Sequence, residues 1–261
     1  MGCLSKLVIV RHGESKYNAL KKIKENDPLY KQFRASYDRD WQSLETRTLA
    51  LAVKQKFFLG VSQHYTPITE EGKRQARVTG ANLKREMLLP DAVFVSPSPR
   101  TRDTFECIKE GWPELAEVGN VYFDERIREQ EHGLLTLFND SKVFFALNPW
   151  QRDLHDLDGE YFFKFPNGEN VPATNLRVGL WFNEVKEKFA RKVVLVVSHH
   201  RAILSMRTVI EGLSPEEFVR IDRDAKPLNC GVTVYKKVPV CGKSGRLALQ
   251  CYNKKLYDDY F

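Results

Sequence analysis

The chain has 261 residues, of which 42% are hydrophobic and 29% are charged, and its formal net charge is +7. This length and composition are those of an ordinary globular chain that can bury one sizeable core. No apolar run in the sequence approaches the roughly 20 residues that cross a bilayer. The first apolar segment begins too close to Met1 to leave room for a signal peptide. We therefore expect one domain over residues 1–261, a cytoplasmic location and no membrane partner.

The net charge of +7 suits either nucleic acid or phosphorylated anions as a binding partner. Basic and aromatic residues do not alternate along the chain, and no nucleic-acid-binding motif is present, so the second class is favoured. The cysteines are odd in number and lack CxxC or CxxH spacing, which favours reduced thiols over a disulfide framework or a metal site. They are Cys3, Cys107, Cys230, Cys241 and Cys251.

The first predicted element is a short strand that leads directly into polar residues. Residues 7–10 are apolar and mostly β-branched, which predicts a buried strand, and Arg11, His12 and Gly13 follow it. In an open α/β sheet, ligands bind just beyond the carboxyl ends of the strands. A cation, an imidazole and a flexible glycine therefore lie where such a fold binds its ligand.

Residues 19–65 form an unusually long connection after this strand. Two sets of apolar residues at helical spacing predict two helices, because a structureless loop of this length is improbable within a compact domain. Two interpretations stay open: a substrate cap beside the ligand site, or a packed addition without function. The lysines near its start either add positive potential at the site or form a solvated face. The residues concerned are Tyr30, Phe33, Tyr37 and Trp41, then Leu49, Val53 and Phe57, and Lys21, Lys22 and Lys24.

The rest of the chain alternates between predicted strands and helices. Strands are expected at 6–10, 92–96, 120–123, 193–198, 231–236 and 246–252. Helices are expected at about 69–87 and 173–190, with a third marked by Ile203, Met206 and Ile210 and ended by Gly212. This alternation predicts an α/β fold, a three-layer α/β/α sandwich with a mostly parallel central sheet and a helical insertion after the first strand.

Several motifs resemble those of the histidine phosphatase superfamily, the phosphoglycerate mutase-like enzymes. The resemblance rests on the order of the motifs from residue 7 to about residue 235, since each motif alone is weak. It is carried by Arg11-His12-Gly13-Glu14-Ser15 with Asn18, by Ser96-Pro97 with Arg100 and Thr104, by the segment from Arg126 to Glu129, and by His199 after a strand. The segments starting at Pro67 and Phe165, and Arg177, are also similar to family features. The implied fold is phosphoglycerate mutase-like.

The resemblance implies a catalytic role for three residues. His12 would take the phosphoryl group and become phosphohistidine, with its other ring nitrogen donating to a fixed acceptor, expected to be a backbone carbonyl. Glu129 would protonate the leaving oxygen and then activate water. His199 would donate to the phosphoryl oxygens, and the guanidinium groups of Arg11 and Arg100 would bind the phosphate.

The remaining predictions concern substrate contacts and cofactors. Asn18, Ser15 and Glu14 would line the substrate side by resemblance, although a glutamate at this position also stabilises a helix start. His200 stands where the family more often has glycine; it is expected to contact the phosphate or leaving group, with the start of the next helix as the alternative. No metal or other cofactor is expected, because cationic side chains neutralise the phosphate. The role of His132 stays open.

The expected activity is hydrolysis of a small phosphorylated substrate, with other readings kept open. Mutases follow their acid with a segment in the style of His-Tyr-Gly and Leu-Asn-Lys, whereas the segment after Glu129 lacks that tyrosine and lysine, which favours a phosphatase. A phosphoglycerate mutase and a sugar-bisphosphate phosphatase remain alternatives. A non-catalytic phospho-ligand-binding protein is less favoured, since the candidate nucleophile and arginines are all present. Glu125 and Glu131 are rival acids, and the oligomeric state is open.

Overall fold

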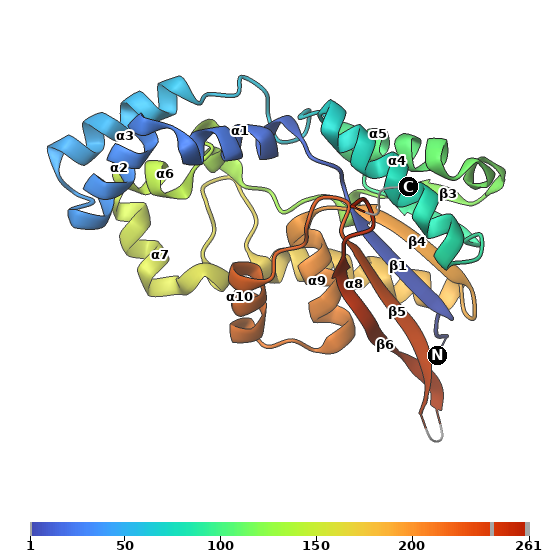
Figure 1. The fold of residues 1–261 in the computed structure, drawn as a ribbon. Helices are drawn as coiled ribbons and strands as arrows, with labels where there is room; N and C mark the ends of the chain where they lie inside the picture. The colour runs from blue at the N-terminus through green and yellow to red at the C-terminus, as the bar shows by residue number, and fades with distance from the viewer. Residues whose placement is uncertain (1, 241–242, 259–261) are drawn as a thin grey trace. The chain divides into compact units, whose positions relative to one another are not determined.

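The computed structural model describes residues 2–240 and 243–258 (Figure 1). Cys241 lies outside the described residues. The chain divides into two compact units. The sheet unit comprises the described parts of 1–15, 67–129 and 173–261, and the helical unit comprises 16–66 and 130–172.

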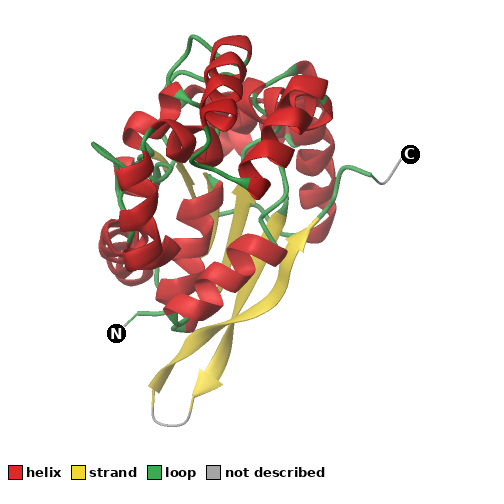
Figure 2. Ribbon diagram, turned by 90° about the vertical axis from the view of Figure 1, so that its left-hand side faces the viewer, coloured by secondary structure: helices red, strands yellow, loops and turns green. Residues whose placement is uncertain are grey.

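The sheet unit contains a mixed six-stranded sheet with the strand order β3-β2-β4-β1-β5-β6. β2 pairs in parallel with β3 and β4, and β4 pairs in parallel with β1, whereas β5 runs antiparallel to both β1 and β6. Figure 2 shows β5 and β6 as a long hairpin. All six strands expected from the sequence are present, at β1 (Lys6–Arg11), β2 (Ala92–Val95), β3 (Val121–Phe123), β4 (Val193–Ser198), β5 (Val232–Val240) and β6 (Lys243–Lys254).

Helices cover both faces of this sheet (Figure 1). One face packs on α4 (Glu70–Glu86) and α5 (Pro99–Gly111), and the other on α8 (Val171–Lys188) and α9 (His200–Glu211). Alternate strand residues point to opposite faces, so Val8 and Val10 join the first core cluster while Leu7 and Ile9 join the second. The inner residues of the central strands are apolar because both faces of the sheet are buried. The expected three-layer sandwich is confirmed.

The helix ends of the sheet unit follow local sequence signals. Thr69 caps α4 by accepting from the Gly72 amide, and Gly212, with φ 73°, ends α9 in the left-handed region. A capping box of Ser214 and Glu217 begins α10 (Pro215–Asp224). The remaining elements of this unit are two short 3₁₀ helices, η1 (Pro113–Glu117) and η2 (Glu125–Ile127). The three predicted helices therefore lie where the sequence placed them.

The insertion holds three helices, not the predicted two: α1 (Lys16–Asn26), α2 (Pro28–Arg39) and α3 (Leu44–Lys56). The two apolar patterns correspond to α2 and α3. α1 was missed because its polar, lysine-rich sequence carries no clear apolar stripe. Asp27 caps α2 with Pro28 in its first turn, which separates α2 from α1. The helical unit is completed by η3 (Gly133–Leu137), α6 (Ser141–Leu147) and α7 (Pro149–Phe162).

The core of the helical unit joins the insertion to α6. The buried aromatic side chains of α2 pack with Ala50 and Val53 of α3 and with Val143 and Ala146 of α6. Phe144 and Phe145 form a second cluster with Phe163. The apolar faces predicted for the insertion thus find their partner within this unit. Among the described residues, no helix combines the length and the apolar character that crossing a membrane requires.

Lys24 corrects one expectation about the insertion. Its side chain is buried, and its Nζ lies 2.7 Å from Asp140 Oδ2 and donates to the carbonyl of Asn139 at 2.9 Å. The Tyr30 hydroxyl donates to the same carboxylate at 2.7 Å. The charge of Lys24 is therefore neutralised inside the helical unit, and both alternatives kept for it, positive potential at a ligand site and a solvated face, are wrong for Lys24.

Candidate active site

The register of the parallel strands brings the candidate residues to one edge of the sheet. Arg11 of β1 is paired with Ser198 of β4, and Val95 of β2 with Val197. The residues that follow these strands therefore lie side by side. The His12 amide donates to the Ser198 carbonyl at 2.9 Å, and the Ser96 amide donates to the Val197 carbonyl at 3.0 Å. His12 and His199 are thus neighbours in space although they lie far apart in the sequence.

His12 is buried and its ring has a defined orientation. Its Nδ1 lies 2.7 Å from the carbonyl oxygen of Gly13. Because a carbonyl can only accept, Nδ1 carries the proton and Nε2 carries the lone pair. This is the backbone partner that the sequence led us to expect. The neutral ring therefore presents a nucleophilic nitrogen.

The loop that carries His12 is held by its surroundings. The Gly13 amide donates to the Thr104 hydroxyl at 2.9 Å, and the Asn229 side chain donates to the His12 carbonyl at 3.1 Å. A Cβ at Gly13 would lie 2.4 Å from the carbonyl oxygen of Gly72, so this position requires glycine. The close contact brings the loop against the start of α4.

His199 and Arg100 form the second part of the site. Both are buried, and Arg100 Nε donates to His199 Nδ1 at 3.1 Å. The proton of the His199 ring is therefore on Nε2, which lies 2.7 Å from the Ser96 hydroxyl and 3.1 Å from the Ser98 hydroxyl. The centroids of the His12 and His199 rings are 5.2 Å apart. The arrangement places a protonated imidazole nitrogen of His199 near the His12 ring.

The electrostatic environment keeps both imidazoles neutral. Burial lowers the pKa of His12 well below its usual value, and the charges of Arg100 and Arg11 lower it further. Burial and Arg100 likewise lower the pKa of His199. Arg11 is half-buried at the end of β1, and its Nη1 donates to the Pro227 carbonyl at 2.7 Å. Two guanidinium charges therefore act on the His12 ring, which suits the binding of an anion.

Glu129 belongs to the same cluster. One carboxylate oxygen accepts from the Arg201 amide, in the first turn of α9, at 3.0 Å. Burial lowers the pKa of Arg11, and the charge of Glu129 is the first opposing influence. The guanidinium of Arg177 donates to the carbonyls of Arg126, Arg128 and Glu129 at 2.8–2.9 Å, which fixes the backbone of the acid segment.

The rival acids have different surroundings. Glu125 begins η2. Glu131 belongs to the helical unit, where its carboxylate lies 3.2 Å from His64 Nε2. Glu129 is the acid that acts on Arg11 and is held by α9, and so it remains the best candidate of the three.

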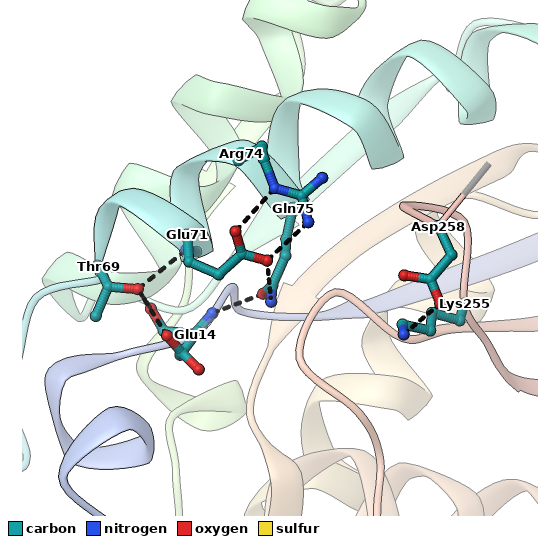
Figure 3. Close-up of polar contacts among 8 residues, drawn as sticks. Glu14, Thr69, Glu71, Arg74, Gln75, Lys255 and Asp258 are labelled. Atoms are coloured by element: carbon teal, nitrogen blue, oxygen red, sulfur yellow. Dashed lines mark hydrogen bonds and ion pairs between the residues drawn. The ribbon is translucent and has the colours of Figure 1, made fainter. Parts of the chain in front are cut away.

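Glu14 lies against the start of α4 in Figure 3, and both Glu14 and Ser15 are buried. The Glu14 amide donates to Gln75 Oε1 at 3.0 Å, and the Thr69 hydroxyl donates to Glu14 Oε1 at 3.1 Å. Figure 3 also shows Glu71 bound to Arg74 on the same helix turn. Ser15 forms an isolated antiparallel bridge with Ile68. These contacts position the loop after His12.

The remaining candidates lie in two places. His200 begins α9, and its Nε2 is 2.5 Å from Asp222 Oδ1. Asn18 lies in α1 and His132 precedes η3, so both belong to the helical unit. Sequence reasoning missed Asp222 and Ser98. No motif in the sequence marks Asp222, because its burial becomes visible only in the structure.

Comparison with known proteins decides the family. The model of the histidine phosphatase superfamily (branch 1) matches residues 59–238. The chain belongs to this superfamily. The matched range begins after Arg11 and His12, so their assignment rests on their own motif and on the geometry above. The chain is accordingly an enzyme of the histidine phosphatase and phosphoglycerate mutase-like type.

A curated relative agrees with this assignment, and solved structures share the fold. The chain is 31% identical over 157 residues to a 2,3-bisphosphoglycerate-dependent phosphoglycerate mutase of Bartonella bacilliformis, covering 58% of this chain and 73% of the relative. A structure described as mycobacterial hydrolase 1 superposes with a TM-score of 0.66 and 18% identity, covering 96% of this chain and 99% of the other. The phosphoserine phosphatase of Entamoeba histolytica gives a TM-score of 0.62 and 16% identity, with 97% and 98% coverage. The two structures share the fold of this chain.

Proposed function

We propose that this chain is a phosphomonoester hydrolase that acts through a phosphohistidine intermediate on His12. The observation that carries the proposal is the contact between His12 Nδ1 and the Gly13 carbonyl, because it leaves Nε2 free to attack phosphorus. Depression of the pKa by burial and by two guanidinium groups supports a ring that is neutral and ready to react.

The first half-reaction transfers the phosphoryl group to the enzyme. His12 Nε2 forms a bond to phosphorus while the bond from phosphorus to the ester oxygen breaks. Arg11, Arg100 and His199 stabilise the negative oxygens, and Glu129 gives its proton to the departing oxygen. In the second half-reaction Glu129 removes a proton from water, the water oxygen bonds to phosphorus, and the bond to His12 breaks to release phosphate.

We further propose that Ser15, Glu14, Asn18 and His200 face the substrate side, as the resemblance implies. For Glu14 and Ser15, the burial beside α4 supports at least a role in holding the nucleophile loop. We also propose that both compact units belong to one histidine phosphatase domain over 1–261. The family match supports this, since residues 59–238 include parts of both units.

A phosphoglycerate mutase is the second candidate, and the name of the Bartonella relative favours it. A mutase returns the phosphoryl group from histidine to an acceptor hydroxyl in place of water. The segment after Glu129 lacks the tyrosine and lysine typical of mutases, which favours hydrolysis. A phosphoserine-like monoester and a sugar bisphosphate are both compatible with the proposed hydrolysis, since each carries a phosphate on an alkyl oxygen.

The Glu129→Gln variant tests the proposed acid. We expect it to lower kcat on alkyl phosphates by about 10²- to 10⁴-fold, the range of general acid–base catalysis. The loss on p-nitrophenyl phosphate should be smaller, because its leaving group departs as a stable anion. The measurement is phosphate release from a panel of sugar phosphates, phosphoglycerates, nucleotides and phosphoamino acids.

Glu125→Gln is the matched control and should keep near-normal rates. Equal losses on both substrate types in Glu129→Gln would contradict the acid role. If the wild type interconverts 3- and 2-phosphoglycerate but releases negligible phosphate from the whole panel, the mutase proposal replaces the hydrolase.

A further inference from the structure

α9 and α10 are consecutive helices, and their arrangement places Asp222 beside the start of α9. Gly212 ends α9 in the left-handed region, and the Ser214–Glu217 capping box starts α10 after a short connection. The two helices contact each other, so their outer ends meet. Asp222, in the last turn of α10, therefore lies against the first residues of α9.

The Asp222 carboxylate contacts two consecutive residues of that turn. Its Oδ1 lies 2.5 Å from His200 Nε2, and its Oδ2 lies 2.9 Å from Arg201 Nη2. Asp222 is buried, with 3% of the residue exposed. Burial raises the pKa of Asp222, but the contact with His200 and the charge of Arg201 outweigh this and hold the pKa below its ordinary value. The Asp222 carboxylate thus restrains the side chains of both His200 and Arg201.

The turn that Asp222 holds also carries two parts of the candidate site. His199 immediately precedes it and bonds to Arg100. The main-chain amide of Arg201 donates to the Glu129 carboxylate. We propose that Asp222 is a positioning residue: by holding His200 and Arg201, it fixes the turn of α9 that aims the general acid Glu129. This inference rests on the proposed function, because it assumes that Glu129 is the acid.

His200 is the link between Asp222 and the reacting groups. Burial lowers its pKa, the Asp222 and Glu129 carboxylates act to raise it, and the Arg11 charge acts to lower it. These groups come from α10, from the segment after η2 and from β1, so His200 faces the candidate site from the start of α9. The close approach of His200 Nε2 to Asp222 Oδ1 restrains the position of the His200 ring.

The Asp222→Asn variant tests the proposal with little change in size. Its amide can accept from only one of the two donors and presents its own N–H to the other, so one contact is lost. We expect kcat on an alkyl phosphate to fall by about 10- to 100-fold, because small displacements of a catalytic group cost about this much. The loss on p-nitrophenyl phosphate should be smaller, because its leaving group needs no proton, and the pH profile of kcat on the alkyl substrate should shift.

Asp224→Asn is the matched control, since Asp224 is on the same helix and exposed. It should keep wild-type values in every assay. Asp222→Glu, which retains the charge, should recover more activity than Asp222→Asn. Equal losses on both substrates, or an unchanged rate and pH profile on the alkyl phosphate, would overturn the positioning role.

A readout that needs no turnover separates this proposal from the proposed function. The ¹³C resonance of the Glu129 carboxyl and the ¹⁵N resonances of the His200 ring should both move in Asp222→Asn but not in Asp224→Asn. Unchanged resonances in Asp222→Asn would overturn the positioning role even in an active enzyme. A wild type that releases no phosphate from any monoester would refute the proposed function, and the resonances would still decide whether Asp222 positions Glu129.

Discussion

The two compact units bury charge in different ways. In the helical unit, Lys24 and Asp140 form a buried pair at 2.7 Å, and the Tyr30 hydroxyl binds the same carboxylate. In the sheet unit, the charges of Arg11 and Arg100 act together on His12 at the strand ends. The first cluster balances its charges internally, whereas the second maintains a positive field.

This difference separates structural charge from charge suited to binding. Burying an ion is costly, so a buried charge needs a partner. In the helical unit the counter-charge of Lys24 is Asp140 of the same unit, so this pair needs no ligand to neutralise it. Two guanidinium charges beside a neutral imidazole are stabilised most by an external anion, and a phosphoryl group carries the required negative charge. The contrast predicts that breaking the first cluster harms stability, whereas breaking the second harms activity.

Lys24→Met should have the largest effect on stability. Removing one partner of a buried ion pair leaves the other buried without its counter-charge, which typically costs about 3–5 kcal/mol. Urea unfolding followed by circular dichroism would measure the loss. Lys22→Met is the matched control, because Lys22 is exposed on the same helix, and it should change the free energy of unfolding little. A loss as small as that of the control would show that the Lys24 pair is not structural.

Arg100→Met tests the other side of the comparison. Removing one preorganised donor to a developing charge lowers kcat by about 10²- to 10³-fold, or about 2.7–4 kcal/mol. The charge that lowers the pKa of His12 is also removed, so that pKa should rise. Arg102→Met is the control, since Arg102 is exposed on the same helix. Near-normal turnover in Arg100→Met would contradict the assignment of the phosphate site.

The buried histidines should make stability depend on pH. Their folded-state pKa values are depressed, whereas an unfolded histidine titrates near 6.5. Their contribution is therefore present above about pH 6.5 and is lost as the pH falls, by up to about 1.4 kcal/mol per pH unit for each group until its folded pKa is reached. Unfolding in phosphate-free buffer between pH 7 and pH 5 measures this slope. The His12→Asn/His199→Asn double variant should have a shallower slope; an identical slope would contradict neutral burial.

The strands and the strand-end residues were predictable because their signals are local. A run such as residues 7–10 specifies a buried strand, and the order of the motifs around Arg11, Arg100 and His199 carries the family resemblance. The pairing of Arg11 with Ser198 then follows from the parallel register. The sequence therefore predicted which residues belong to the candidate site, whereas the tautomer of His12 follows from the structure.

The features that were missed depend on partners distant in sequence. α1 has a lysine-rich sequence, and the burial of Lys24 becomes visible only with Asp140 beside it, 116 positions later. Asp222 reads as an ordinary polar residue of an amphipathic helix until the turn at Gly212 brings it to His200. Local patterns do not report such long-range ion pairs, because a charged residue looks the same in sequence whether it is solvated or paired.

The most direct test of the account is the covalent intermediate on His12. Enzyme incubated with a ³²P-labelled monoester and quenched should carry label that is stable to base and labile to acid, as a phosphorus–nitrogen bond is. Peptide mapping should place the label on residues 11–13, and His12→Asn should carry none while His64→Asn keeps it. Label on another residue, or near-normal turnover in His12→Asn, would contradict the central claim.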